Sequence, residues 1–153
     1  MKVVIAADHR GFALKEKLKK HLLSCGFSVA DGGAFVEDDG DDYPDFAYRA
    51  AREVSHASED RGIFICGSGT GMQIAANKMP GIRAAAGSSK DAVVRARQEE
   101  DVNVLALAAD TTNESLAFAL ANLFLSTPFS GDERHRRRIA KIQAIEHAAT
   151  HRS

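Results

Sequence analysis

A cysteine stands directly before a glycine-rich turn in ICGSGTGMQIAANK, residues 65–78. Backbone N–H groups that glycine leaves uncovered, beside the start of a helix, stabilise a bound phosphate or an oxyanion formed during a reaction. Such donors also favour the thiolate form of a nearby thiol, so Cys66 is a candidate base or nucleophile. The alternative is a tight connection between a strand and a helix, with an inert buried cysteine like the one we expect at Cys25. The spacing G-x-G-x-G matches neither a P-loop nor a dinucleotide fingerprint.

Two further segments place charged residues where they suit a small anionic ligand. Asp8 and His9 directly follow the apolar run VVIAA, residues 3–7, so Asp8 is either a helix cap or part of a site. Arg134 and Arg138 lie one helical turn apart in ERHRRRIAK. Their guanidinium groups could clamp one phosphate, and a solvated basic helix face is the alternative.

Short apolar runs alternate with helical patterns along the chain. The expected strands cover residues 3–7, 27–31, 62–66, 82–87 and 103–108, and the expected helices cover 12–24, 45–55, 72–79, 88–100, 113–126 and 134–149. Runs without strict alternation predict strands buried on both faces, and hence a parallel sheet in a three-layer α/β/α sandwich. Ligands bind such sheets at the carboxyl ends of the strands, where the turns DHRG, CGSGTG and AADTTN all fall.

The composition is ordinary for a soluble globular protein. The 153 residues suit one domain, 1–153, with 44% apolar residues and a net charge of −1. This balance argues against attraction to nucleic acids or membranes, and no apolar run is long enough to span a bilayer. Met1 leads into a short strand rather than a signal peptide, and two cysteines make no disulfide framework, so we expect a cytoplasmic protein. No cluster of Cys and His has metal-ligand spacing, so we expect no metal.

Several motifs together resemble the type B ribose 5-phosphate isomerases and the related galactose 6-phosphate isomerase subunits. They are AADHRGFALK, DYPDFA, CGSGTGMQIAANK, GIRAA and NVLAL, and the resemblance runs from Met1 to about His147 with almost no gaps. It implies a flavodoxin-like sandwich and an aldose–ketose isomerase, which is an intramolecular oxidoreductase, with no metal or organic cofactor. It also implies a homodimer or a tetramer whose sites draw on both subunits, with the helix at 134–149 reaching the partner.

The resemblance assigns roles in isomerisation to the glycine-rich turn. The reaction passes through a cis-enediolate, so it needs a base and a hole for an anion. Cys66 corresponds to the base, and Ser68 could move a proton between the enediolate oxygens. Met72 stands where relatives without the cysteine carry a glutamate, which makes this chain one of the cysteine type. The backbone that would hold the enediolate is that of Gly67, Ser68, Gly69, Thr70 and Gly71.

Other residues correspond to those that bind the sugar and its phosphate. Asp8 and His9 would contact the sugar, helping to open its ring or to bind its phosphate. Tyr43 would contact the substrate, although packing within a turn is equally open from the sequence. The pattern R-H-x-x-R, which binds phosphate across the dimer, corresponds to Arg134, His135 and Arg138.

Two departures from the family concern the substrate. Glu99, in QEEDVNV, takes the place of a histidine that opens a furanose ring, and Asp110 takes the place of an arginine that holds phosphate. An anion beside a doubly charged phosphate turns attraction into repulsion. Glu99 could carry out the proton transfer itself, the substrate could be a sugar that forms no furanose ring, or Arg10 could supply the lost charge.

We therefore expect an isomerase of a phosphorylated sugar of the ribose 5-phosphate type. The first alternative is an isomerase of another sugar phosphate, such as a tetrose or hexose phosphate. A non-catalytic subunit that keeps the fold and binds a sugar phosphate is the second, motivated by Glu99 and Asp110. A flavodoxin-like nucleotide binder is the weakest, because the turn lacks a nucleotide fingerprint.

Overall fold

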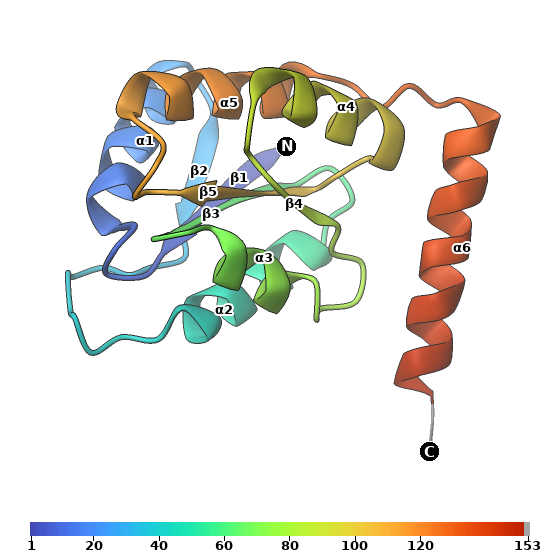
Figure 1. Ribbon diagram of the computed structural model, residues 1–153, viewed down its shortest axis with the longest axis horizontal. Coiled ribbons are helices and arrows are strands. Elements are labelled where there is room, and N and C mark those ends of the chain that lie inside the picture. The colour runs from blue at the N-terminus through green and yellow to red at the C-terminus, as the bar shows by residue number, and fades with distance from the viewer. Residues whose placement is uncertain (152–153) are drawn as a thin grey trace.

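The computed structural model describes residues 1–151, so the last two residues of the predicted domain, 152 and 153, lie outside the described part. The chain forms a five-stranded sheet with helices between the strands (Figure 1). The strands are β1 (Lys2–Ala7), β2 (Ser28–Asp31), β3 (Arg61–Cys66), β4 (Ala84–Ala86) and β5 (Val104–Ala108). The helices are α1 (Phe12–Ser24), α2 (Tyr43–Ser55), α3 (Thr70–Ala76), α4 (Lys90–Glu100), α5 (Glu114–Ser126) and α6 (Glu133–Thr150).

The strand order is β2-β1-β3-β5-β4, and all neighbouring strands run parallel. Helices α1, α4 and α5 cover one face of the sheet, and α2 and α3 cover the other (Figure 1). The predicted three-layer sandwich is therefore confirmed. The last two strands are exchanged relative to the order 2-1-3-4-5 of flavodoxin. Because the chain passes from β1 outward to β2 and then back across to β3, the order reverses between β1 and β3.

The sheet separates two apolar layers that follow the alternation of side chains along each strand. In β3, Ile63 and Ile65 pack in the layer beneath α1, α4 and α5. Phe64 and Cys66 point to the other side, into the layer formed with α2 and α3. The thiol of Cys66 therefore lies on the face that α3, the helix after the glycine-rich turn, covers.

The structure shifts some predicted boundaries for identifiable reasons. Helix α2 begins at Tyr43 rather than near residue 45, because Pro44 is well suited to a first helical turn. Helix α3 ends at Ala76, where the Asn77 side chain leaves the helix and bonds the backbone N–H and C=O of Ala84 at 2.8 and 3.0 Å. That same contact pins the edge strand β4, which is three residues long instead of six.

The prediction that Cys25 is buried is wrong. Helix α1 ends at Ser24, Cys25 is its C-cap, and Gly26 follows with a φ of +86°, so the chain reverses at the surface. The thiol is exposed and lies 3.7 Å from Nε2 of His21, one turn earlier in the same helix. Helical spacing placed Leu14, Leu18 and Leu22 correctly in the core, but it says little about a residue at the end of a helix.

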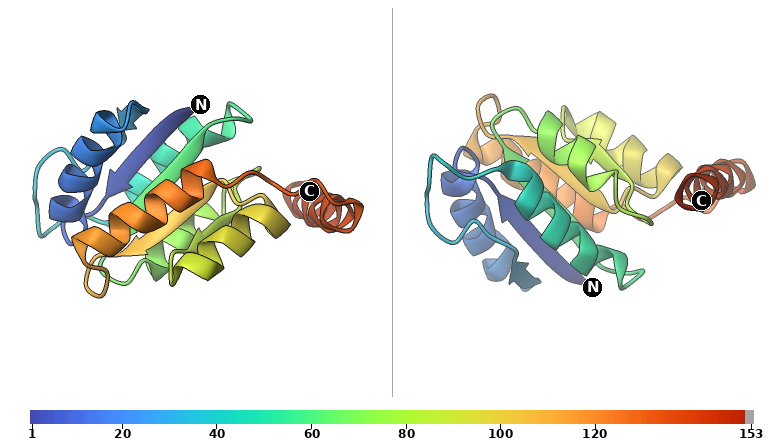
Figure 2. Two further views of the ribbon diagram at one scale, coloured as in Figure 1. Left: turned by 90° about the horizontal axis from the view of Figure 1, so that it is seen from above. Right: turned by 90° about the horizontal axis from the view of Figure 1, so that it is seen from below.

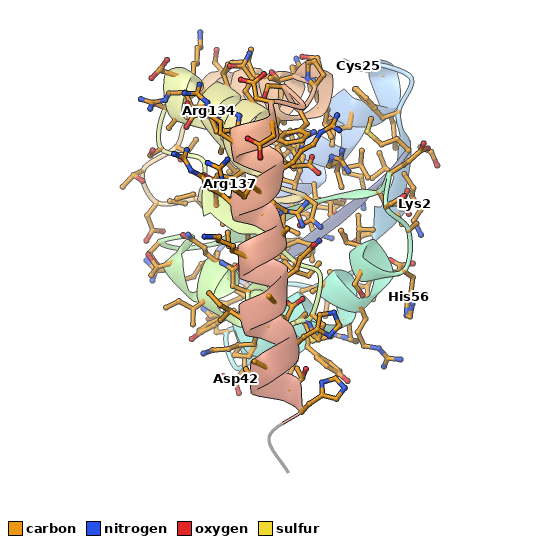
Figure 3. All side chains as sticks on the ribbon, turned by 90° about the vertical axis from the view of Figure 1, so that its right-hand side faces the viewer. Lys2, Cys25, Asp42, His56, Arg134 and Arg137 are labelled. Atoms are coloured by element: carbon orange, nitrogen blue, oxygen red, sulfur yellow. The ribbon has the colours of Figure 1, made fainter. Side chains whose placement is uncertain are left out.

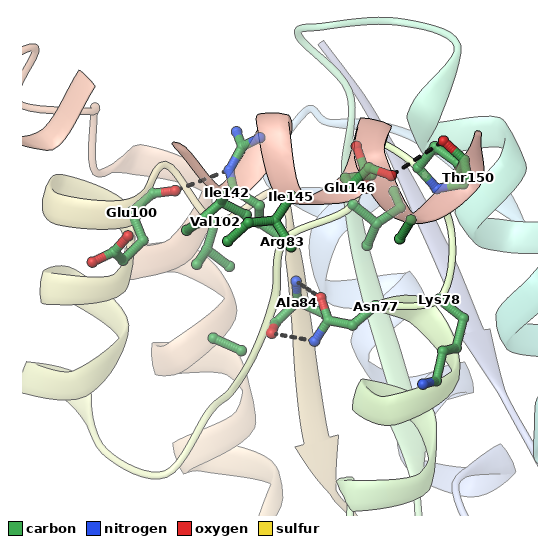
Figure 4. A pocket seen from close by; sticks show the side chains of 14 residues that line it. Asn77, Lys78, Arg83, Ala84, Glu100, Val102, Ile142, Ile145, Glu146 and Thr150 are labelled. Carbon is green, nitrogen blue, oxygen red and sulfur yellow. Dashed lines mark hydrogen bonds between the residues drawn. The ribbon is translucent and has the colours of Figure 1, made fainter. Parts of the chain in front are cut away.

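Helix α6 stands beside the sandwich rather than on either face of the sheet, and Figure 2 shows it nearly end-on beyond β4. Its buried residues are His135 and Ile139. A cavity of about 610 Å³ lies between α6 and the chain around β4, and Ile142 and Ile145 line it (Figure 4). These two isoleucines remain 46% and 70% exposed, so α6 leaves part of its apolar surface uncovered.

Candidate active site

The carboxyl ends of β1 and β3 lie side by side at the point where the strand order reverses. Ala7 pairs with Ile65 in the sheet register, and the N–H of Asp8 donates to the carbonyl of Ile65 at 3.3 Å. The segment after β1 therefore runs along the segment after β3, and it brings Asp8 and His9 next to Cys66. Ligands bind open α/β sheets at this crevice.

The turn after β3 uses its carbonyl groups, while most of its N–H groups have no hydrogen-bond acceptor within the described part of the chain. The carbonyls of Cys66 and Gly67 accept the N–H groups of Ala109 and Asp110, at 2.9 and 3.0 Å. These bonds fix the turn against the segment after β5. Helix α3 is only seven residues long, so the loop donors matter more than its dipole. Within residues 1–151, no acceptor is bonded to the N–H groups of Gly67, Ser68, Gly69 and Gly71.

Two of the glycines are required by close approaches. Gly69 has a φ of +75°, and a Cβ there would lie 3.1 Å from the carbonyl carbon of Leu107 in β5. A Cβ on Gly71 would fall 2.7 Å from Cζ of Tyr43. The ring of Tyr43 thus lies against the first turn of α3, and its role as a substrate contact stays a prediction. Tyr43 is 39% exposed, so its hydroxyl is not sealed within the core.

A small cavity opens beside the turn at the carboxyl edge of β3, β5 and β4. Its volume is about 290 Å³, and hydroxyl groups of Ser68, Ser88, Thr111 and Thr112 contribute to its lining. The larger cavity under α6 is lined mainly by apolar side chains and includes none of the residues around Cys66. Of these two cavities, the smaller one adjoins the turn after β3, because Ser68 is among its lining residues.

Asp8 and His9 have distinct partners. The carboxylate of Asp8 is buried and accepts the N–H of Gly11 at 3.0 Å, which is the cap-like role open from the sequence. His9 instead turns to Asp41, whose Oδ1 accepts the His9 backbone N–H at 3.0 Å and its Nδ1–H at 2.7 Å. The hydrogen bond that His9 donates to Asp41 raises the pKa of His9, against the opposing effect of burial, and the charges of Asp41, Asp8 and Asp39 raise it further.

The sequence alone did not single out Asp41. It lies in the acidic segment EDDGDDYPD, where six similar carboxylates give no signal for choosing one. Asp8, His9 and Asp41 place potential ligand atoms within 4.8 Å of one another. Because the His9–Asp41 hydrogen bond already joins two of these atoms, we assign the group to hydrogen bonding rather than to a metal.

The two unusual charges at positions 10 and 110 form an ion pair. The guanidinium of Arg10 bonds Oδ2 of Asp110, and both side chains are partly exposed. The same guanidinium lies against Gly67, because a Cβ on that glycine would be 2.5 Å from Cζ of Arg10. A positive charge therefore stands at the glycine-rich turn, and the negative charge of Asp110 is paired there.

Glu99 lies away from this site within the chain. Helix α4 starts near the carboxyl edge of the sheet, after β4, and runs back to the amino edge. There Arg83, just before β4, donates from Nε to the carbonyl of Glu100 at 3.0 Å. The Glu99 side chain bonds Arg95 at 3.3 Å on the surface of α4. One chain thus does not bring Glu99 to Cys66.

The predicted phosphate-binding residues also lie away from Cys66, at the start of α6. Figure 3 shows Arg134 at this end of the helix, and Arg134 and Arg138 are both exposed. His135 is buried, with Nδ1 2.9 Å from Oγ of Ser130. The backbone N–H of Ser130 donates to the carbonyl of Gln98 at 3.1 Å, which places the start of α6 beside the end of α4 and near Glu99.

The site residues therefore form two groups in one chain. The first, the turn group, surrounds the turn after β3 and contains Asp8, His9, Tyr43, Cys66, Gly67, Ser68, Gly69, Thr70 and Gly71. The second, the arm group, lies at the end of α4 and the start of α6 and contains Glu99, Arg134, His135 and Arg138. The first group places a thiol beside backbone N–H groups, and the second contains exposed arginine side chains.

The model of the ribose/galactose isomerase family matches residues 3–142. The chain belongs to this family. It is 42% identical over 145 residues to a probable ribose-5-phosphate isomerase B of Mycoplasma genitalium, covering 94% of this chain and 95% of that protein. It is 38% identical to the ribose-5-phosphate isomerase B of Escherichia coli, covering 95% and 96% of the two chains.

Solved structures of family members have the same fold. The ribose-5-phosphate isomerase B of Mycoplasma genitalium with bound ribulose-5-phosphate matches with a TM-score of 0.92 and 41% identity, over 95% of this chain and 96% of that chain. The enzyme of Thermotoga maritima matches with a TM-score of 0.89 and 44% identity, over 94% and 97%. Among residues 1–151, no helix combines the length and apolar character needed to cross a membrane.

Proposed function

We propose that the protein is an isomerase that interconverts ribose 5-phosphate and ribulose 5-phosphate. The observation that carries the proposal is the thiol of Cys66 at the point where the strand order reverses, beside a turn in which four N–H groups have no acceptor among residues 1–151. Family relatives at 42% and 38% identity are named ribose-5-phosphate isomerase B, which supports the choice of substrate. So does the related structure that holds ribulose-5-phosphate.

The turn group can perform both halves of the reaction. The Cys66 thiolate would remove the proton from C2 of the open-chain aldose, and the electron pair would move into a C1–C2 double bond as O1 gains negative charge. The free N–H groups of the turn would hold the cis-enediolate. Ser68 would move a proton between O1 and O2, and the Cys66 thiol would then return its proton to C1. The aldehyde carbon is reduced and the neighbouring carbon is oxidised, so the step balances within the sugar.

We also propose that two copies of the chain form each complete site. The turn group and the arm group lie apart in one chain, although a sugar phosphate needs both a base and a phosphate anchor. A twofold dimer brings the arm group of each copy to the turn group of the other without any further component. The exposed Ile142 and Ile145 on α6 supply apolar surface for such a contact. We place the protein in the cytoplasm, where reducing conditions preserve the thiol that the mechanism requires.

The decisive experiment measures isomerisation of ribose 5-phosphate by the wild type and by Cys66→Ala. Loss of the base is expected to lower kcat by roughly 10²–10⁴-fold with the fold intact, as checked by circular dichroism. Cys25→Ala is the matched control, because this exposed thiol lies at the far end of α1, and its activity should equal that of the wild type. Undiminished turnover by Cys66→Ala would remove the proposed base.

Because Glu99 stands in place of a histidine that opens a furanose ring, a tetrose phosphate is included in the assay as an alternative substrate. A tetrose 4-phosphate forms no furanose ring, so its isomerisation needs no group for opening the ring. Erythrose 4-phosphate and allose 6-phosphate are therefore assayed beside ribose 5-phosphate, together with the variant Glu99→His. Faster turnover of erythrose 4-phosphate, with no gain on ribose 5-phosphate in Glu99→His, would move the proposal to the tetrose. Calorimetric binding without turnover of any of the three would favour the non-catalytic subunit.

A further inference from the structure

The loop between β2 and α2 supplies a partner for His9 that lies 32 residues away in sequence. Oδ1 of Asp41 accepts two bonds from the same residue, from the backbone N–H at 3.0 Å and from ring Nδ1 at 2.7 Å. A carboxylate oxygen can only accept, so Nδ1 carries a proton. Because both hydrogen bonds end on the same oxygen, they hold the main chain of His9 and the rotation of its ring together.

We propose that Asp41 is the positioning residue for His9, holding its ring as a cation whose Nε2–H binds an anionic oxygen of the substrate. Nε2 has no hydrogen-bond partner among the described residues, and about a quarter of the His9 side chain is exposed. The proposal rests on the proposed isomerase function, because it assigns His9 to the phosphorylated sugar. It adds a residue that acts through His9 rather than on the substrate.

The charges around His9 all favour the protonated ring. Asp8 lies next to it in the chain, and Asp39 and Asp41 face it from the loop before α2. The Asp41 hydrogen bond is the largest cause of the raised pKa, and it outweighs the lowering by burial. In a neutral histidine whose proton is on Nδ1, Nε2 can only accept a hydrogen bond. Such an Nε2 cannot donate to an anionic oxygen. Asp41 thus determines whether Nε2 is a donor.

One feature of Asp41 is costly for a purely structural residue. Its side chain is 10% exposed, and its Oδ2 is buried with no hydrogen-bond partner within residues 1–151. Buried carboxylate oxygens are nearly always bonded, because desolvation without a partner costs free energy. Asp41 therefore has one buried oxygen without a partner among the described residues and one oxygen that accepts both hydrogen bonds from His9. This arrangement fits a role in setting the charge and direction of the His9 ring.

The test uses Asp41→Asn in the full-length protein, because asparagine keeps an acceptor oxygen of the same shape and removes the charge. The pKa of His9 should fall toward its ordinary value, as followed by the NMR titration of its ring protons in the free protein. Since the protonated ring is the active form, the alkaline limb of kcat/KM should move to lower pH. At pH 8 kcat/KM should fall by about tenfold relative to the wild type, and at pH 6 it should stay within about threefold. Asp42→Asn, the neighbouring acid at the N-cap of α2, is the matched control and should shift neither curve.

The outcomes separate this proposal from the proposed function. A uniform loss of activity at every pH, with the His9 titration unchanged, would reduce Asp41 to a structural residue and overturn the proposal. A wild type that isomerises no sugar phosphate would refute the proposed function, and the NMR titration would then decide the role of Asp41 alone. In that case inorganic phosphate is the probe. Its binding should weaken more at pH 8 than at pH 6 in Asp41→Asn, and equal binding by both proteins would reject the assignment.

Discussion

The turn group and the arm group differ in what holds them in place. Around Cys66, the main chain is fixed by bonds to the segments after β1 and β5, so its N–H groups are oriented before any ligand arrives. At the start of α6, Arg134 and Arg138 are exposed, and the helix touches the rest of the chain mainly along α4 and the region around β4. One chain therefore holds the main chain around Cys66 in place, whereas it leaves Arg134 and Arg138 exposed at the start of α6.

Mixing two inactive variants tests this division and carries the largest expected effect. Cys66→Ala removes the base in the turn group, and Arg138→Ala removes charge-assisted bonds to phosphate in the arm group. Cys66→Ala should lose about a hundredfold or more in kcat/KM, and Arg138→Ala should lose about tenfold or more through a higher KM. In a mixed dimer one site carries both changes and the other is intact. Equal mixing after subunit exchange should therefore restore about a quarter of wild-type activity.

The control mixes Cys66→Ala with Ser68→Ala. Both changes lie in the turn group, so every site of the mixed dimer keeps one of them and no activity should return. Recovery in this control, or none in the Cys66→Ala and Arg138→Ala mixture despite subunit exchange shown by mass spectrometry, would contradict a site shared between copies.

The sequence predicted the strands, the helices and the glycine-rich turn well, and it predicted contacts between residues distant in sequence poorly. Apolar runs and helical spacing predicted the sandwich, since strands and helices of this kind depend on near neighbours in sequence. The turn at Cys66 was predicted because its glycines, at positions 67, 69 and 71, lie close together in the chain. The pairs His9–Asp41 and Arg10–Asp110 join residues 32 and 100 positions apart, so only the folded sheet brings them together.

The strand order and the place of α6 were beyond the same reasoning. Nothing in the apolar pattern of IRAAAG indicates that β4 lies at the edge with β5 inside it, because both runs are short and apolar. A basic run such as ERHRRRIAK reads as a helix, but the face of the molecule that receives it depends on contacts formed elsewhere. The roles of Arg134 and Arg138 therefore remain predictions.

The second prediction concerns stability, because a buried ion pair holds the segment that leads to the loop carrying Asp41. Lys15 is fully buried, and its Nζ lies 2.7 and 2.9 Å from the two carboxylate oxygens of Asp31, just before the loop that carries Asp41. Lys15→Met should lower the free energy of unfolding by about 3 kcal/mol at pH 7, as measured by urea denaturation. In this variant Lys19 keeps its 2.6 Å hydrogen bond to Asp31. The loss of unfolding free energy should therefore lie at the lower end of the range for breaking a buried ion pair.

The pH dependence of this loss follows from the pKa of Asp31. Burial opposes ionisation of the carboxyl, but the hydrogen bonds from Lys15 and Lys19 outweigh it and lower the pKa. The pair's contribution is therefore present above the unfolded pKa of about 4 and is lost as the pH falls through the lower folded value. The gap in stability between the wild type and Lys15→Met should narrow at pH 3. A gap that is equal at pH 3 and pH 7 would contradict a role for the ionised carboxylate.

The smallest effect is expected for Arg137, which lies beside the proposed phosphate-binding residue Arg138 in α6. Arg137 forms a 2.7 Å pair with Glu133 one turn earlier, and both side chains are more than half exposed. An exposed pair at this spacing contributes about 0.3–0.5 kcal/mol, so Arg137→Ala should change the unfolding free energy by no more than that. Its kcat/KM should stay within about twofold of the wild type, whereas Arg138→Ala, an identical change one residue later, should raise KM by about tenfold or more. If Arg137→Ala raised KM as much, general attraction by a basic helix would explain the arm group better than a clamp formed by Arg134 and Arg138.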